Sequence, residues 1–69
     1  MIDDWIKIKD MIPGRPRLVL VCGLSKPLNI WYYHIGMLGG SRNEYVFRAE
    51  GERGHDVHVT ATKWQELRS

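Results

Sequence analysis

The chain of 69 residues contains one cysteine and three prolines, and neither sign of charge dominates it. A single cysteine, Cys22, excludes an internal disulfide and fits a reducing compartment. It lies in the apolar run "LVLVCG", which predicts a buried thiol that packs as a small hydrophobic side chain. The sequence therefore gives no indication of a reactive or metal-binding thiol.

The chain also lacks a long hydrophobic run. No apolar stretch approaches the roughly 20 residues that span a bilayer. The sequence starts Met-Ile-Asp-Asp, whereas a secretory signal peptide starts with positive charge. We therefore expect a protein of the cytosol with no membrane partner.

Charge and length set two further bounds. Ten lysines and arginines against eight acidic residues give a net charge of +2, with both signs interspersed. This is typical of a solvated surface and is modest for a nucleic-acid-binding protein. The length predicts a single domain over residues 1–69, whose small core makes self-association worth considering, although the sequence does not predict an oligomeric state.

Turn-forming residues divide the chain into short segments. Clusters of Gly, Pro, Asn and Ser occur at residues 13–16, 23–27, 39–43 and 51–55. The segments between them are rich in β-branched and aromatic residues, which favour strands. These segments are 17–22, 29–38, 44–50 and 56–64. The pattern predicts a mainly β domain, an antiparallel sheet of four to five strands that is either curled or closed into a small SH3-like barrel.

Alternation along these strands predicts which side chains face the core. In segment 29–38 we assign Trp31, Tyr33, Ile35 and Met37 to the core and the alternating set that includes Tyr32 and His34 to the surface. In the later segments the predicted core residues are Tyr45, Phe47, Ala49, Val57, Val59 and Ala61. A hairpin is expected between 29–38 and 44–50, around the glycine-containing loop "GGSRN".

The N-terminal stretch "DDWIKIKDMIP" at residues 3–13 is ambiguous. As a helix it would place Trp5, Ile8 and Ile12 on one face, whereas as a strand it would alternate isoleucines with lysines. Both alternatives remain open. A β domain of this size needs its large aromatic side chains inside, so we expect the two chain ends to meet, with Trp5 and Trp64 buried near each other.

Both ends of the chain carry a recognisable pattern. It consists of Trp5-Ile6, Lys9-Asp10, Ile12-Pro13, the "LVLV" stretch at 18–21, Thr62-Lys63-Trp64 and Leu67. Over residues 5 to 67 the chain thereby resembles a family of short bacteriophage and prophage proteins, domain of unknown function 551. It departs from the family where Lys63 replaces a histidine and Arg68 a proline, so no role of that histidine transfers. The resemblance implies a phage or prophage origin and an accessory role, and it implies no chemistry.

Enzymatic motifs find little support. His55, Asp56 and His58 are close in sequence, but two histidines three apart on a strand point to opposite faces, and no further pair completes a four-ligand set. The acidic pair Glu50 and Glu52 is typical of a solvated surface. The sequence therefore predicts no catalytic residue, no metal and no cofactor.

Two binding functions remain. The first is a phage product that binds and modulates or inhibits a host protein, one involved in defence being an example. The second is a small nucleic-acid-binding β module, in which aromatic residues stack on bases and arginines neutralise phosphates. For either function the candidate surface residues are Tyr32, His34, Arg42, Arg48, Arg53 and His58. The alternative is that these residues only cover the core edge and keep the protein soluble. The modest net charge favours a protein partner.

Overall fold

The computed structural model describes residues 4–26, 29–41 and 44–67. In these ranges the chain is mainly β, without an α-helix, as predicted. The strands are β1 (Ile6–Lys7), β2 (Arg17–Ser25), β3 (Ile30–Leu38), β4 (Val46–Glu50), β5 (Asp56–Thr60) and β6 (Lys63–Gln65), with a 3₁₀ turn at Glu52–Gly54 between β4 and β5.

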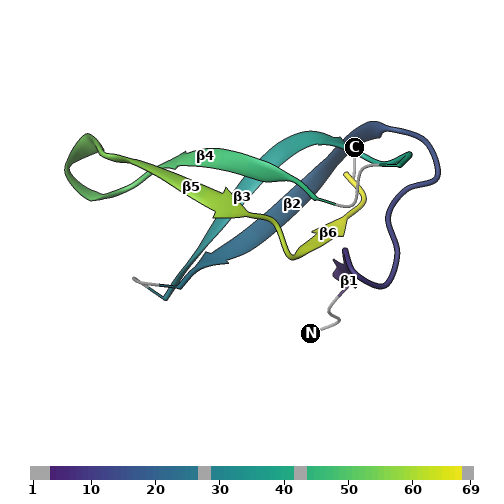
Figure 1. The fold of residues 1–69 in the computed structure, drawn as a ribbon, viewed down its shortest axis with the longest axis horizontal. Coiled ribbons are helices and arrows are strands. Elements are labelled where there is room, and N and C mark those ends of the chain that lie inside the picture. Colours follow the sequence, from purple (N-terminus) through teal and green to yellow (C-terminus); the bar gives the residue numbers. More distant parts are fainter. Residues whose placement is uncertain (1–3, 27–28, 42–43, 68–69) are drawn as a thin grey trace.

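The strands form two antiparallel sheets (Figure 1). One has four strands in the order β1-β6-β2-β3, and the other consists of β4 and β5. The long β2–β3 hairpin curves around the β4–β5 sheet, but the two sheets do not close into a barrel. The curled-sheet alternative is therefore correct and the SH3-like barrel is not.

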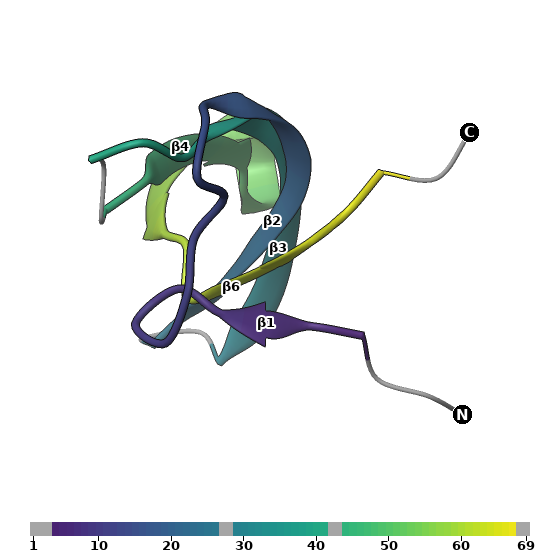
Figure 2. The same cartoon turned by 90° about the vertical axis from the view of Figure 1, so that its right-hand side faces the viewer.

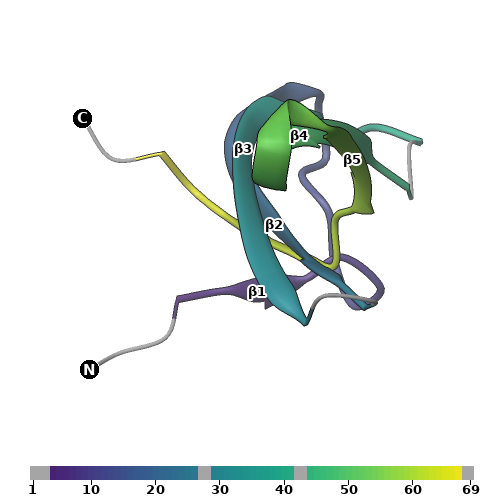
Figure 3. The ribbon, with the colours of Figure 1, turned by 90° about the vertical axis from the view of Figure 1, so that its left-hand side faces the viewer.

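The N-terminal stretch forms only a minimal strand. Ile6 pairs with Trp64 in β6, and the chain then turns, with the amides of Asp10 and Met11 both donating to the carbonyl of Lys7. The prediction that the two chain ends meet is confirmed, but the prediction that both tryptophans are buried is wrong for Trp5, which is only half-buried. Figures 2 and 3 show that the described parts of both terminal segments, from residue 4 and up to residue 67, extend to the side of the β2–β3 hairpin that faces away from the β4–β5 sheet.

The predicted strand 56–64 is two strands. The chain leaves the two-stranded sheet at Ala61, whose amide donates to the carbonyl of Tyr45, and joins the four-stranded sheet at Thr62, whose amide donates to that of Cys22. This short crossing segment links the two sheets, and alternation alone gave no sign of the change of partner.

The predicted hairpin between 29–38 and 44–50 is wrong. β3 pairs with β2 along its whole length, and β4 pairs with β5. Gly39 and Gly40 adopt positive φ angles of 138° and 68°, a backbone conformation that residues other than glycine rarely adopt. Beyond this turn the chain passes across β3, and Tyr45 packs so closely over Gly36 that a Cβ there would lie 1.8 Å from its hydroxyl.

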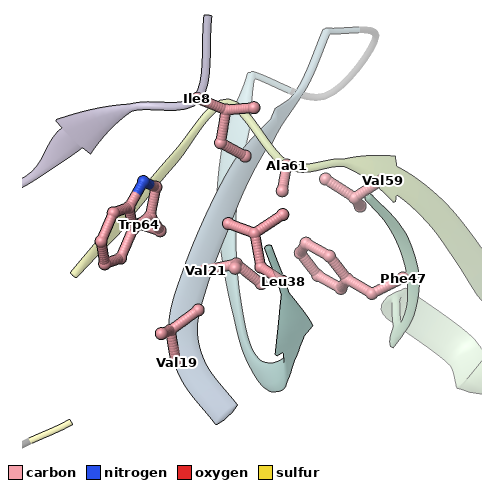
Figure 4. Packing of buried hydrophobic residues seen from close by; sticks show 8 residues of the cluster. All are labelled: Ile8, Val19, Val21, Leu38, Phe47, Val59, Ala61 and Trp64. Atoms are coloured by element: carbon pink, nitrogen blue, oxygen red, sulfur yellow. The ribbon is translucent and has the colours of Figure 1, made fainter. Parts of the chain in front are cut away.

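The core lies between the two sheets (Figure 4). Its buried members come from both sheets and from the turn after β1: Ile8, Val19, Val21, Leu38, Phe47, Val59, Ala61 and Trp64. The indole N–H of Trp64 donates to the carbonyl of Met11 at 2.9 Å, so this buried polar group has a partner. Cys22 is fully buried, as predicted.

The predicted faces of β4 and β5 are confirmed, but the predicted faces of β3 are reversed. Phe47 and Val59 are buried, whereas Val46 is exposed. In β3 it is Gly36 and Leu38 that are buried, whereas the four residues assigned to the core are exposed. The reason is the β4–β5 sheet, which packs on the face of β3 that offers a glycine opposite Tyr45.

Candidate protein-binding surface

The most prominent surface feature is an apolar sheet face turned away from the core. Because cross-strand neighbours in an antiparallel pair share a face, the register places Leu18 beside Met37 and Leu20 beside Ile35. Tyr33 and Trp31 continue this face toward the start of β3. We call it the outer face and define it by its exposed apolar residues Leu18, Trp31, Tyr33, Ile35 and Met37.

These side chains are exposed to an unusual degree for apolar residues. Trp31 is the least exposed at 44% and Tyr33 the most at 60%. At roughly 150–250 Å² for a large side chain, the five together expose on the order of 500 Å². The largest apolar patch of a typical monomer is about 300–600 Å² and is often functional. The outer face lies in the upper part of that range.

One end of the outer face is aromatic and cationic. Trp5 lies against Tyr33 with a ring centroid distance of 5.9 Å. The Lys63 ammonium lies 4.7 Å from the ring centre of Trp31 and 5.3 Å from that of Trp5, within the range of cation–π attraction. Trp5 is therefore half-buried on the outer face, while Trp64 is buried in the core, so the two tryptophans lie on opposite faces of the sheet.

The other end of the outer face is aliphatic. Leu18, Ile35 and Met37 form it, with half-buried Leu20 between them. Gln65 on β6 is level with Leu20. The face thus runs from flat rings beside a cation to branched aliphatic side chains.

A groove adjoins the aromatic end. It has a volume of about 540 Å³. Its lining consists of Lys7, Ile8, Lys9, Trp31, Glu44, Thr60, Ala61, Thr62 and Lys63. Lys7 and Lys63 are directly opposite each other on β1 and β6, an arrangement of like charges that costs stability. An anionic group in this groove would reduce that repulsion.

Two predicted binding residues have the wrong orientation. Tyr32 and His34 lie on the inner face of β3, where both are half-buried, and Tyr32 packs against the core. The His34 ring stacks on Phe47 at a centroid distance of 5.2 Å and an interplanar angle of 5°. Their surroundings give these two residues a packing role.

The other predicted binding residues do not join them. Arg48 and His58 are exposed cross-strand neighbours on the β4–β5 sheet, where Arg48 pairs with Asp56 at 3.2 Å. Arg53 lies in the 3₁₀ turn of this hairpin with a positive φ of 60°. Arg42 lies outside the described residues. The predicted patch is therefore divided between two sheets.

Sequence reasoning missed the outer face because it assigned the four β3 residues of this face to the core. The available signal was that segment 29–38 is apolar on both alternating sets, while a sheet covered on one side needs only one. The surplus apolar set marked an exposed face.

Metal chemistry has no visible site in the described ranges. No group of three His, Cys, Asp or Glu residues there is placed to hold a metal ion. Across the same residues, no helix has the length and apolarity needed to cross a membrane. Comparison of the chain with protein-family models, curated proteins and solved structures finds no match.

Proposed function

We propose that this protein is a non-enzymatic binding module whose outer face contacts another protein. The observation that carries the proposal is the exposure of five large apolar side chains on one face of a sheet. Aromatic residues and methionine are enriched at protein interfaces, and buried tryptophan and tyrosine dominate their energetics. Trp31, Tyr33 and Met37 supply these residue types.

The partner class that we propose is a host protein in the cytosol of a bacterial cell, which the phage or prophage product modulates or inhibits. The support is the resemblance of the two chain ends to short phage proteins, together with a size that suits surface contact rather than a deep pocket. The chemistry of the outer face fits a partner that offers a complementary apolar surface.

Capture from a bacterial lysate tests this function. The immobilised wild type is compared with Tyr33→Ser and Met37→Ser, and the matched control is Val46→Ser, because Val46 is equally exposed at 54% but belongs to the other sheet. We expect a protein retained by the wild type and the control and weakened by roughly 30-fold, about 2 kcal/mol, in the face variants. Equal retention by all four proteins would contradict the proposal.

Nucleic-acid binding is the second candidate, and the lysine-lined groove beside Trp31 and Trp5 favours it. Single-stranded nucleic acids bind where bases stack on aromatic rings and cations track the backbone. Titration with labelled oligonucleotides over a salt series distinguishes this function. Loss of Lys63 by Lys63→Gln would then lower the slope of log affinity against log salt by about 0.7–1, whereas Arg53→Gln would leave it unchanged. Salt-independent or absent binding excludes it.

A further inference from the structure

We propose that, in the free protein, the outer face of one molecule packs on the outer face of a second copy to form a symmetric dimer. This inference rests on the proposed function, because it concerns the same binding surface. A second copy is a partner whose surface is known from the structure over the described residues. Its suitability can therefore be argued residue by residue.

The packing is face to face rather than edge to edge. β3 is the outermost strand of the four-stranded sheet, so its edge could pair with another strand. However, edge pairing extends the sheet in its own plane and leaves side chains such as Tyr33 and Ile35 as exposed as before. Only contact through the faces removes these side chains from water, which is the dominant favourable term in association.

The two ends of the outer face are complementary under a two-fold axis. This axis lies in the plane of the interface, perpendicular to the strands, at the level midway between Tyr33 and Ile35. It places β3 of one copy over β3 of the other, with the strand directions opposed. The aromatic end of each copy, at Trp31, then lies on the aliphatic end of the other, at Met37 and Leu18. Flat rings therefore pack on branched and flexible side chains, and no ring is forced to face its own copy.

The charges are compatible with this arrangement. Lys63 is level with Cys22 and Gln65 with Leu20, so the same axis brings Lys63 of one copy to the level of Gln65 of the other. Arg17 and Glu66 form an ion pair on the other face of the sheet, where the Arg17 guanidinium lies over the ring of Trp64, so this pair brings no charge into the interface. Self-association thus opposes no like charges across the centre of the interface.

The exposed area is close to what a stable dimer needs. A standard interface buries about 800 Å² on each partner, and the five exposed side chains supply on the order of 500 Å² of that. Half-buried Trp5 and Leu20 lie within the same face and the exposed Leu67 follows β6, so they add to the contact. Because entropy and ordering reduce the affinity obtained from a given area, we expect dissociation at micromolar concentration.

Dimerisation regulates access to the outer face. A host protein and the second copy compete for the same side chains, so a host protein must bind the monomer. Partner capture is then stronger at low protein concentration, and a saturating partner converts the dimer into a complex that holds one copy of this chain.

Sedimentation equilibrium of the full chain tests the proposal, over a range from about 1 to 200 µM that brackets a micromolar dissociation constant. We expect the wild type and Val46→Lys to pass from monomer to dimer over this range. Ile35→Lys and Ile35→Glu should each remain monomeric, because residue 35 lies beside the proposed axis and its charge meets the same charge on the second copy. An equimolar mixture of the two variants should form a heterodimer through the opposite charges.

Each outcome decides the proposal. A wild type that stays monomeric at the highest concentration overturns it, as does a dimer that both Ile35 variants retain or that Val46→Lys abolishes. If the Ile35 variants do not fold, as judged by circular dichroism, Tyr33→Ser replaces them, and we expect it to dimerise at least tenfold more weakly than the wild type. A monomer that still captures a host protein through the outer face contradicts only self-association. If the protein dimerises but the outer-face variants capture host proteins as strongly as the wild type, only the proposed function is contradicted.

Discussion

Trp64 connects three parts of the chain through its backbone and its side chain. It is 2% exposed, pairs through its backbone with Ile6 and Val21, and donates its indole N–H to the carbonyl of Met11. We expect Trp64→Phe to cost about 1–3 kcal/mol, because it removes the hydrogen bond of a buried side chain and part of the volume that this side chain fills. Trp64→Ala should cost about 3–5 kcal/mol, comparable to the whole stability of a domain of this size. Urea denaturation measures both. A Phe variant as stable as the wild type would show that the hydrogen bond contributes nothing.

Gly23 permits the close approach of the two sheets. A Cβ at this position would lie 2.3 Å from the carbonyl oxygen of Thr60 and 2.6 Å from a methyl group of Val59. Because a backbone oxygen cannot move aside cheaply, Gly23→Ala should lower the free energy of unfolding by about 1–3 kcal/mol.

The matched control for this substitution is Gly14→Ala, since a Cβ at Gly14 meets no atom within 4 Å. Gly14→Ala should be neutral or stabilise the fold by roughly 0.4–1 kcal/mol, through the lower entropy of the unfolded chain. The comparison is made by thermal unfolding. Equal effects at the two positions would contradict the close approach.

The strands show how far sequence reasoning extends. Alternation predicted the inward sets of β4 and β5 because each of those strands has one polar and one apolar set. It failed for β3, where Trp31, Tyr33 and their neighbours compete with an almost equally apolar set. Which set is buried depends on where the β4–β5 sheet packs, and that position is fixed by the turn at Gly39 and by the contact of Tyr45 with Gly36. These contacts join residues that are distant in the sequence, and the alternation of neighbouring residues does not predict them.

The predicted binding residues were affected by the same reversal of the β3 faces. Because the faces of β3 are the reverse of those predicted, Tyr32 and His34 pack on the inner side, and the exposed apolar residues of β3 form the outer face instead. Which aromatic side chains of β3 are exposed depends on the tertiary structure, and the sequence pattern alone did not give it.

β2 should be the most protected element. Leu20, Val21 and Cys22 pair with β3 on one side and with β6 on the other, whereas β4 and β5 form an isolated two-stranded ladder. Two-stranded sheets are marginally stable by themselves, and local opening governs exchange where few contacts oppose it. We expect the amides of these three β2 residues to exchange most slowly, and those of Arg48 and His58 faster. Hydrogen exchange followed by NMR measures this order. Equal protection in both sheets would show that they open only together.

The whole molecule depends on one core shared by two sheets. Val21 and Leu38 come from the four-stranded sheet, Phe47 and Val59 from the two-stranded sheet, and the segment at Ala61 joins them without a linker. Neither sheet has a second apolar layer of its own to cover this inner face. Loss of this shared core therefore unfolds both sheets, whereas local opening differs between them. The outer face is the only large apolar surface of the described sheets that the shared core leaves uncovered.

The thermal midpoint should depend on protein concentration if a second copy covers the outer face. Association that only the folded state can make stabilises it by mass action, by about 2.7 kcal/mol when the free partner exceeds the dissociation constant roughly 100-fold. We expect the midpoint of the wild type to rise with concentration, and that of Ile35→Lys to stay constant and to match the wild type at high dilution, because exposed substitutions alter stability by only about ±0.5 kcal/mol. Differential scanning calorimetry at several concentrations measures this. A wild-type midpoint independent of concentration would mean that the apolar side chains of β3 remain in contact with water in the free protein, which contradicts the dimer.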